Sequence, residues 1–189
     1  MSAPLDRRLA EIVRAAPSLM AVLTVARDLD LPDWMIFSGA IYQRVLNRLT
    51  GREPDYGIKD YDLGYFDPDT SYEAEDRVIR RVAAAFDPPL RQMVEVRNQA
   101  RVHLWFEGKF GEAYAPLAST GEALGRFVSP LFAVGVRLEA DDSLSVAAPF
   151  GLEDLFALRL APNPHRQTNG FARTAASATA RWPELIVAD

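Results

Sequence analysis

The chain has 189 residues, of which 49% are apolar and 25% charged, with a formal net charge of -5 and no cysteine. This length fits one domain with its own core, since domains cluster near about 100 to 150 residues, and the composition excludes global disorder. The lack of cysteine excludes disulfides, thiolate zinc sites and cysteine nucleophiles, and the negative charge disfavours binding to duplex DNA.

The first thirty residues predict two helices. Apolar side chains recur at helical spacing over residues 5 to 16 and 18 to 29, and Pro17 separates the two runs. The N-terminus lacks the apolar stretch of a secretory signal, and no run of about 18 apolar residues is present. We therefore expect a cytoplasmic protein that does not bind a membrane.

Strands and helices alternate from residue 34 onward. Each assignment depends on apolar periodicity and on Gly or Pro at the boundaries. In chain order, the pattern predicts a strand at 34–37, a helix at 41–49, a strand at 61–66, a helix that begins with a capping box of Thr70 and Glu73, a strand at 93–105, a hairpin of 132–138 and 144–148, a short helix at 151–160 and a helix at 171–181.

This order predicts an α/β (α+β) fold in which helices pack against a mixed central sheet. We assign residues 1–189 to one domain, with N-terminal helices at 1–30, a core at 34–160 and a C-terminal helix and tail at 165–189.

Two aspartates at the start of the 61–66 strand form a candidate metal site. Asp60 and Asp62 are two residues apart, so on a strand their carboxylates point to the same face. Mg²⁺ binds one or two protein carboxylates together with phosphate oxygens, which makes magnesium the expected ion and manganese the alternative. Two such ions can activate a hydroxyl and stabilise a leaving pyrophosphate.

Ser38, Gly39 and Ala40 form a candidate phosphate-binding turn between the 34–37 strand and the helix that follows. The free N–H groups and the dipole at a helix N-terminus attract phosphate oxygens, and Gly39 permits close approach. The alternative is an ordinary turn that binds no ligand, because glycine is the most common residue in tight turns of the backbone.

The alternating polar side chains of residues 93–105 supply further candidates. Glu95 lies at the start of this polar face, where it can bind the metal or deprotonate an acceptor hydroxyl. Arg101 and His103 are favoured over Arg97 as binders of phosphate, the alternative being a solvated sheet face. Trp105 is either a cover residue or the border of a base-stacking pocket.

Longer stretches resemble a known family. The chain resembles the DNA polymerase β nucleotidyltransferase superfamily in the order of its motifs. That order is an apolar run, Ser38-Gly39, a helix, Asp60-Tyr61-Asp62-Leu63 and a later acidic strand residue. The chain is similar over roughly residues 34 to 187 to a family of bacterial nucleotidyltransferase-like proteins, through the segments FSGAIYQRVLNRLTG, IKDYDLGYFD, VEVRNQARVHLW, FAVGVRL and APFGLEDLFALRLAPNP. Two departures are Ser-Gly in place of the usual Gly-Gly or Gly-Ser and a long gap before Asp60.

The resemblance implies the superfamily fold and a magnesium-dependent transfer of a nucleotidyl group from a nucleoside triphosphate to an acceptor hydroxyl. The acceptor can be a small molecule, a protein or an RNA. Two alternatives stay open: an inactive nucleotide-binding or regulatory module of the same fold, and an interaction or antitoxin-like protein with structural aspartates. A fold alone does not decide among them, because function depends on the site.

Overall fold

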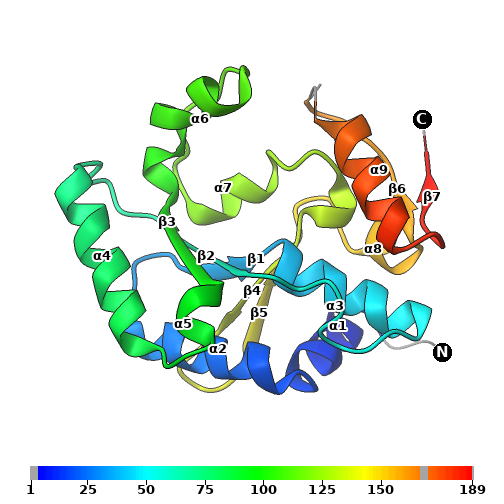
Figure 1. Ribbon diagram of the computed structural model, residues 1–189, viewed down its shortest axis with the longest axis horizontal. Helices are drawn as coiled ribbons and strands as arrows, with labels where there is room; N and C mark the ends of the chain where they lie inside the picture. The colour runs from blue at the N-terminus through cyan, green and yellow to red at the C-terminus, as the bar shows by residue number, and fades with distance from the viewer. Residues whose placement is uncertain (1–3, 167–169, 189) are drawn as a thin grey trace.

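The computed structural model describes residues 4–166 and 170–188. Its helices and strands alternate along the chain (Figure 1). In chain order they are α1 (Leu5–Arg14), α2 (Pro17–Leu29), β1 (Met35–Phe37), α3 (Gly39–Thr50), β2 (Tyr61–Tyr65), α4 (Tyr72–Ala85), α5 (Leu90–Met93), β3 (Val94–Asn98), α6 (Val102–Phe110), α7 (Thr120–Leu124), β4 (Gly135–Leu138), β5 (Leu144–Ala147), α8 (Glu153–Phe156), β6 (Arg159–Leu160), α9 (Phe171–Arg181) and β7 (Ile186–Val187). Short 3-10 helices occupy Gln99–Arg101 and Pro130–Phe132.

The central sheet has five strands in the order β3-β2-β1-β4-β5. β1 is antiparallel to both β2 and β4, β4 is antiparallel to β5, and β2 is parallel to β3. The predicted mixed sheet is therefore confirmed. A separate pair of short strands, β6 and β7, runs parallel beside α9 near the C-terminus (Figure 1).

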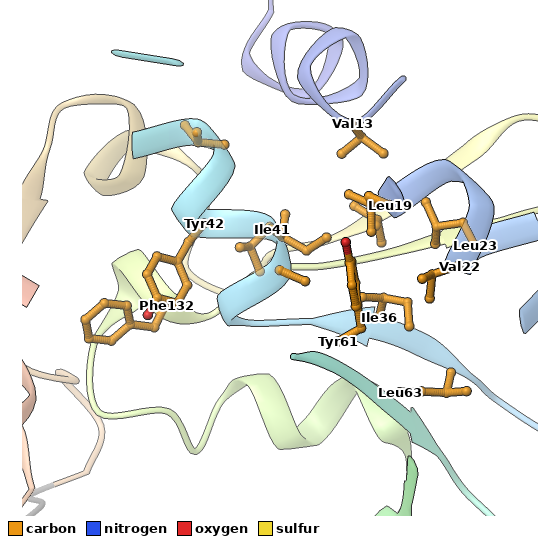
Figure 2. Close-up of a cluster of buried hydrophobic side chains, with 14 of the residues drawn as sticks. Val13, Leu19, Val22, Leu23, Ile36, Ile41, Tyr42, Tyr61, Leu63 and Phe132 are labelled. Atoms are coloured by element: carbon orange, nitrogen blue, oxygen red, sulfur yellow. The ribbon is translucent and has the colours of Figure 1, made fainter. Parts of the chain in front are cut away.

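The main core lies between the sheet and the helices α1, α2 and α3. Alternate residues of β2, Tyr61 and Leu63, face this core together with Ile36 of β1, while α1 and α2 contribute leucines and valines (Figure 2). Because strand side chains alternate between faces, Asp62 and Gly64 of β2 point to the opposite side of the sheet. In Figure 1, α6 and α7 lie on the far side of the sheet from α2.

Among the described residues, no single helix is long and apolar enough to cross a membrane. The pair α1 and α2, bent by 94° at the break between them, meets those criteria only when the two are taken together.

The strand predicted at 93–105 ends at Asn98, and this part of the prediction is wrong. The Asn98 side chain accepts a hydrogen bond from the N–H of Ala100 at 3.0 Å and caps a 3-10 helix, which leads into α6. The same side chain accepts the Asp67 N–H at 3.1 Å and donates to the Asp67 carbonyl at 2.8 Å. A buried amide thus turns the chain where alternation of apolar residues would continue a strand.

Two smaller predictions are also wrong. Helix α4 is capped by Ser71, whose side chain accepts from the Ala74 N–H at 3.3 Å, so Thr70 and Glu73 do not form the predicted capping box. The helix predicted at 151–160 covers only Glu153–Phe156, because the chain then enters β6 through Leu158, which has a φ of 56°.

Candidate active site

The predicted acidic residues come together where β2 and β3 run side by side. Asp62 and Glu95 are register partners in the parallel pair β2 and β3, so their side chains leave the same face of the sheet. Asp62 is also the register partner of Phe37 in β1, the residue directly before the Ser38 turn. Asp60 precedes β2 by one residue, and at two positions from Asp62 it belongs to the same side.

The charge on Asp62 is costly in this position. Burial raises the pKa of the Asp62 carboxyl from 3.8 to about 7, and the neighbouring carboxylates of Asp60 and Glu95 add to the rise. Arg97 opposes it, because its positive charge favours the ionised carboxylate. Burial is the largest of these causes, and the effects of Asp60 and Glu95 show that both carboxylates lie near enough to Asp62 to disfavour its ionised form.

The carboxylates of Asp60, Asp62 and Glu95 are of the kind that binds a hard divalent cation. The three carboxylates are not close enough together to ligate one ion directly. Over residues 4–166 and 170–188, no three Asp, Glu, His or Cys side chains are close enough together to hold a metal ion as they stand. Mg²⁺ keeps several water ligands and binds few protein carboxylates directly, so Asp60 and Asp62 with Glu95 nearby match its chemistry.

The Ser38 turn has an unusual backbone. Ser38 has a φ of 59° and a ψ of -121°, a conformation that side chains disfavour, and its carbonyl accepts the N–H groups of Ile41 and Tyr42 at 2.9 and 3.0 Å. Its own N–H donates to Val134 of the adjoining segment at 2.9 Å. Strained backbone of this kind clusters at functional sites. Gly39 and Ala40 follow as the first residues of α3, where helix geometry leaves N–H groups without helical partners.

A cavity of about 530 Å³ opens beside this turn, and Phe37 and Ser38 form part of its wall. Burial raises the pKa of Tyr42, another wall residue, and the Asp62 carboxylate adds a smaller effect in the same direction. The cavity and the carboxylate of Asp62 are therefore neighbours. Its walls are largely aromatic, being formed in part by Phe37, Tyr42, Phe106, Phe110, Tyr114, Phe127 and Phe132.

Three arginines from distant segments also line the cavity: Arg126 after α7, Arg166 before the gap in the described chain, and Arg173 on α9. Arg166 donates to a carboxylate oxygen of Glu112 at 2.8 Å and to the Arg126 carbonyl at 2.7 Å. Sequence reasoning missed all three. The only signal was the position of Arg173 at the start of the predicted helix at 171–181, since nothing local marks the other two.

The other predicted phosphate binders lie elsewhere. Arg101 follows the end of β3, pairs with Glu75 at 3.0 Å and donates to the Thr70 carbonyl at 2.9 Å. His103 lies on α6, and its Nδ1 is buried with no hydrogen-bond partner in the described part of the chain. Neither residue lines the cavity. Arg97 instead shares the face of Asp62. The placement of Arg101 and His103 on that face assumed a continuous strand, which is wrong, because β3 ends at Asn98.

A buried arginine connects the turn to the acidic strand. Arg44 of α3 is 2% exposed and donates to the Ala40 carbonyl at 2.6 Å and to the Tyr61 hydroxyl at 3.0 Å. It also pairs with Asp55, in the loop before β2, at 2.6 Å. Since Tyr61 lies between Asp60 and Asp62, one guanidinium fixes the helix that follows the Ser38 turn relative to the carboxylates.

The five-stranded mixed sheet, the turn before α3 and the acidic residues on β2 and β3 define a nucleotidyltransferase fold of the DNA polymerase β type. A solution NMR structure described as revealing a CCA-adding enzyme head domain is similar, with a TM-score of 0.75 and 26% identity over 97% of this chain and 95% of the other. A CCA-adding enzyme in complex with CTP matches with a TM-score of 0.55 and 15% identity over 100% of this chain and 44% of the other, which supports the fold alone.

Residues 24–187 match the model of a nucleotidyltransferase family, and the chain belongs to that family. No curated protein matches the sequence.

Proposed function

We propose that the protein transfers a nucleotidyl group from a nucleoside triphosphate to an acceptor hydroxyl in a magnesium-dependent reaction. The acceptor oxygen bonds to the α-phosphorus, the bond from that phosphorus to the bridging oxygen breaks, and pyrophosphate leaves. Family membership supports this reaction class. The observation that carries the proposal is the register pairing of Asp62 with Glu95 beside the Phe37 and Ser38 end of an aromatic, cationic cavity.

Each group has a distinct task. Asp60 and Asp62 would hold the metal with Glu95 close by, and Glu95 accepts the proton of the acceptor hydroxyl. A bound metal would supply positive charge that offsets the charge of the triphosphate and of the leaving pyrophosphate. The N–H groups of Gly39 and Ala40 and the guanidiniums of the cavity contact phosphate oxygens.

The cavity suits a nucleotide by its composition. Aromatic walls stack with a base, because every base has a π-face, and each such contact contributes about 1 to 3 kcal/mol. Arg173 of α9 is exposed and pairs with no carboxylate of the described residues, which leaves its guanidinium available for phosphate. Arg126 lines the cavity from another segment, so the two arginines can bind a triphosphate together.

Calorimetric titration with Mg²⁺ and each nucleoside triphosphate tests binding, and pyrophosphate release over a panel of acceptors tests turnover. We expect micromolar binding that the variant Asp60→Ala/Asp62→Ala loses. Asp6→Asn, which changes an exposed carboxylate on α1, serves as the control. Equal binding by wild type and the double variant would refute the proposal.

A second function, triphosphate binding without turnover, is supported by one observation. The three acidic residues do not form a finished ligand cluster within the described chain. Pyrophosphate release that Asp62→Asn abolishes would exclude this alternative. Binding with no release across the acceptor panel would support it.

A further inference from the structure

A second cavity, of about 650 Å³, lies between α1, α3 and the loop that follows α3. Helix α1 packs against α3 beside it (Figure 1). Arg44 and Arg48 of α3 line this cavity, whereas Tyr42 lines the cavity of the proposed active site, and positions 42 and 44 of a helix point about 200° apart. The α1–α3 cavity, as we call it, therefore lies on the other side of α3, and within the described chain the two cavities share no wall residue.

Three charged side chains on the wall of the α1–α3 cavity have no partner of opposite charge. They are Glu11 of α1, Arg48 of α3 and Glu53 of the loop, and all three are exposed. Within residues 4–166 and 170–188, their side chains form no ion pair with one another or with any other residue. Because they border one cavity without reaching one another, a ligand placed between them can pair with all three.

Arg44 and Arg52 also line the cavity, but carboxylates from outside it compensate both of their charges. Arg44 pairs with Asp55 at 2.6 Å, and Arg52 pairs with Glu184 at 2.8 Å. Neither Asp55 nor Glu184 lines the cavity. The charges left for a ligand are therefore one guanidinium and two carboxylates, which match a ligand with one negative and two positive groups.

Two helix C-termini add negative potential at the same place. Ala15 and Ala16 directly follow α1 and line the cavity. Gly51 directly follows α3 and lines it as well. The carbonyl end of a helix carries a partial negative charge, so both helix ends favour a ligand in which positive groups outnumber negative ones.

The negative group of such a ligand belongs beside α3. Arg44 and Arg48 are four residues apart, so their side chains lie on one face of the helix. Arg44 is 2% exposed, and its Nε is buried with no hydrogen-bond partner in the described part of the chain. A carboxylate that pairs with Arg48 therefore also lies close to a buried positive charge whose hydrogen bonds are incomplete.

We propose that the α1–α3 cavity binds a basic amino acid such as lysine or arginine. The ligand's carboxylate pairs with Arg48, and its two cationic groups pair with Glu11 and Glu53. Its methylene chain contacts the apolar side chains of Ile12 and Pro54, which also line the cavity. The cavity volume is in the range of about 300 to 1,000 Å³ that is usual for small-molecule sites. This binding requires neither metal nor triphosphate, so the inference does not depend on the proposed function.

Calorimetric titration with L-lysine and L-arginine tests the inference, and two analogues of lysine each lack one charged group. Cadaverine has no carboxylate, and L-norleucine has no side-chain ammonium. We expect lysine to bind with millimolar or higher affinity. Each analogue should bind about two- to fivefold more weakly than lysine, which is the effect of losing one exposed ion pair.

Variants of the wall assign each charge to its partner. Arg48→Met should lower the affinity for lysine about two- to fivefold and should not lower that for cadaverine, which has no carboxylate. Glu11→Gln/Glu53→Gln should lower the affinity for both ligands. The matched controls are Arg7→Met and Glu73→Gln, which change exposed charges on α1 and α4 outside the cavity and should bind lysine as the wild type does.

Two results with the wall would overturn the inference: no binding of either basic amino acid, or equal affinity for lysine in the wild type and Arg48→Met. Loss of lysine binding in Asp60→Ala/Asp62→Ala would also overturn it, because the ligand would then lie at the acidic residues of the proposed active site. A wild type that binds triphosphate but no basic amino acid refutes this inference alone. One that binds lysine but no triphosphate refutes only the proposed function.

Discussion

Asp62 and Glu95 lie opposite one another on the parallel strands β2 and β3, and the Glu95 carboxylate opposes ionisation of Asp62. The two residues are 33 positions apart in the sequence, so only the sheet brings them together. The fold therefore accumulates negative charge in the apoprotein at the point where the proposed reaction needs a cation. Several measurable effects result from this arrangement.

Asp62→Asn should stabilise the apoprotein at pH 8. The folded pKa of about 7 lies above the ordinary 3.8, so the folded state retains the proton between these values. Stability from Asp62 is complete below pH 3.8 and is lost as the pH rises through 7. The shift corresponds to about 4 kcal/mol, and some water contact reduces the expected gain to about 2 to 3 kcal/mol. Urea unfolding at several pH values measures it.

The same variant should lose the response to metal. Mg²⁺ should raise the melting temperature of the wild type at pH 8 and leave that of Asp62→Asn unchanged, because binding to the folded state alone is stabilising. Asp6→Asn should behave as the wild type in both experiments. A difference between wild type and Asp62→Asn that does not shrink towards pH 4 would contradict the explanation.

Glu95→Gln should lower pyrophosphate release by about 10² to 10⁴, which is the usual contribution of a general base. The exposed Glu95 contributes little to the core, so stability should change by less than about 0.5 kcal/mol. Glu73→Gln, on the exposed side of α4, is the control. If Glu95→Gln retains affinity for Mg²⁺ and triphosphate, Glu95 acts as a base. If affinity falls with turnover, it acts as a metal ligand.

Local patterns predicted much of the fold and part of the site. Spacing placed Asp60 and Asp62 on one face, and alternation after residue 93 identified Glu95, because strand geometry repeats every two residues. The end of that strand could not be predicted from the sequence, because it depends on hydrogen bonds between Asn98 and a loop thirty-one residues earlier in the sequence. The cavity could not be predicted either, because Arg126 and Arg166 are brought together only by tertiary contacts.

Ser38→Gly should stabilise the protein by about 1 kcal/mol. Ser38 has a φ of 59° with a ψ of -121°, which glycine adopts without a steric penalty, and strain at such a position costs of order 1 to 3 kcal/mol. The greater entropy of an unfolded glycine offsets part of the gain. Thermal unfolding measures the change. Ser38→Val, a β-branched residue, should lower stability and weaken triphosphate binding, and a stable Ser38→Val would contradict the assignment of strain.

Arg44→Met should weaken binding of Mg²⁺ and triphosphate at least about tenfold. The substitution removes the hydrogen bonds that hold the Ala40 carbonyl and the Tyr61 hydroxyl, so the turn and the acidic strand lose their common anchor. It should also cost about 2 to 3 kcal/mol of stability, because buried polar groups are left unpaired. Calorimetric titration at a temperature where circular dichroism shows a folded protein measures the binding loss.

Asn47→Ala separates this positioning role from general stability. Asn47 is also fully buried on α3, and it donates to the Pro54 and Tyr56 carbonyls at 3.1 and 2.9 Å. Within the described part of the chain, no hydrogen bond joins it to Tyr61. The two variants should lose similar stability, and only Arg44→Met should lose affinity. Tyr61→Phe, which removes the hydroxyl alone, should show a smaller binding loss that does not add to that of Arg44→Met, because both break the same contact. Equal losses of affinity in Asn47→Ala and Arg44→Met would assign Arg44 to the core instead.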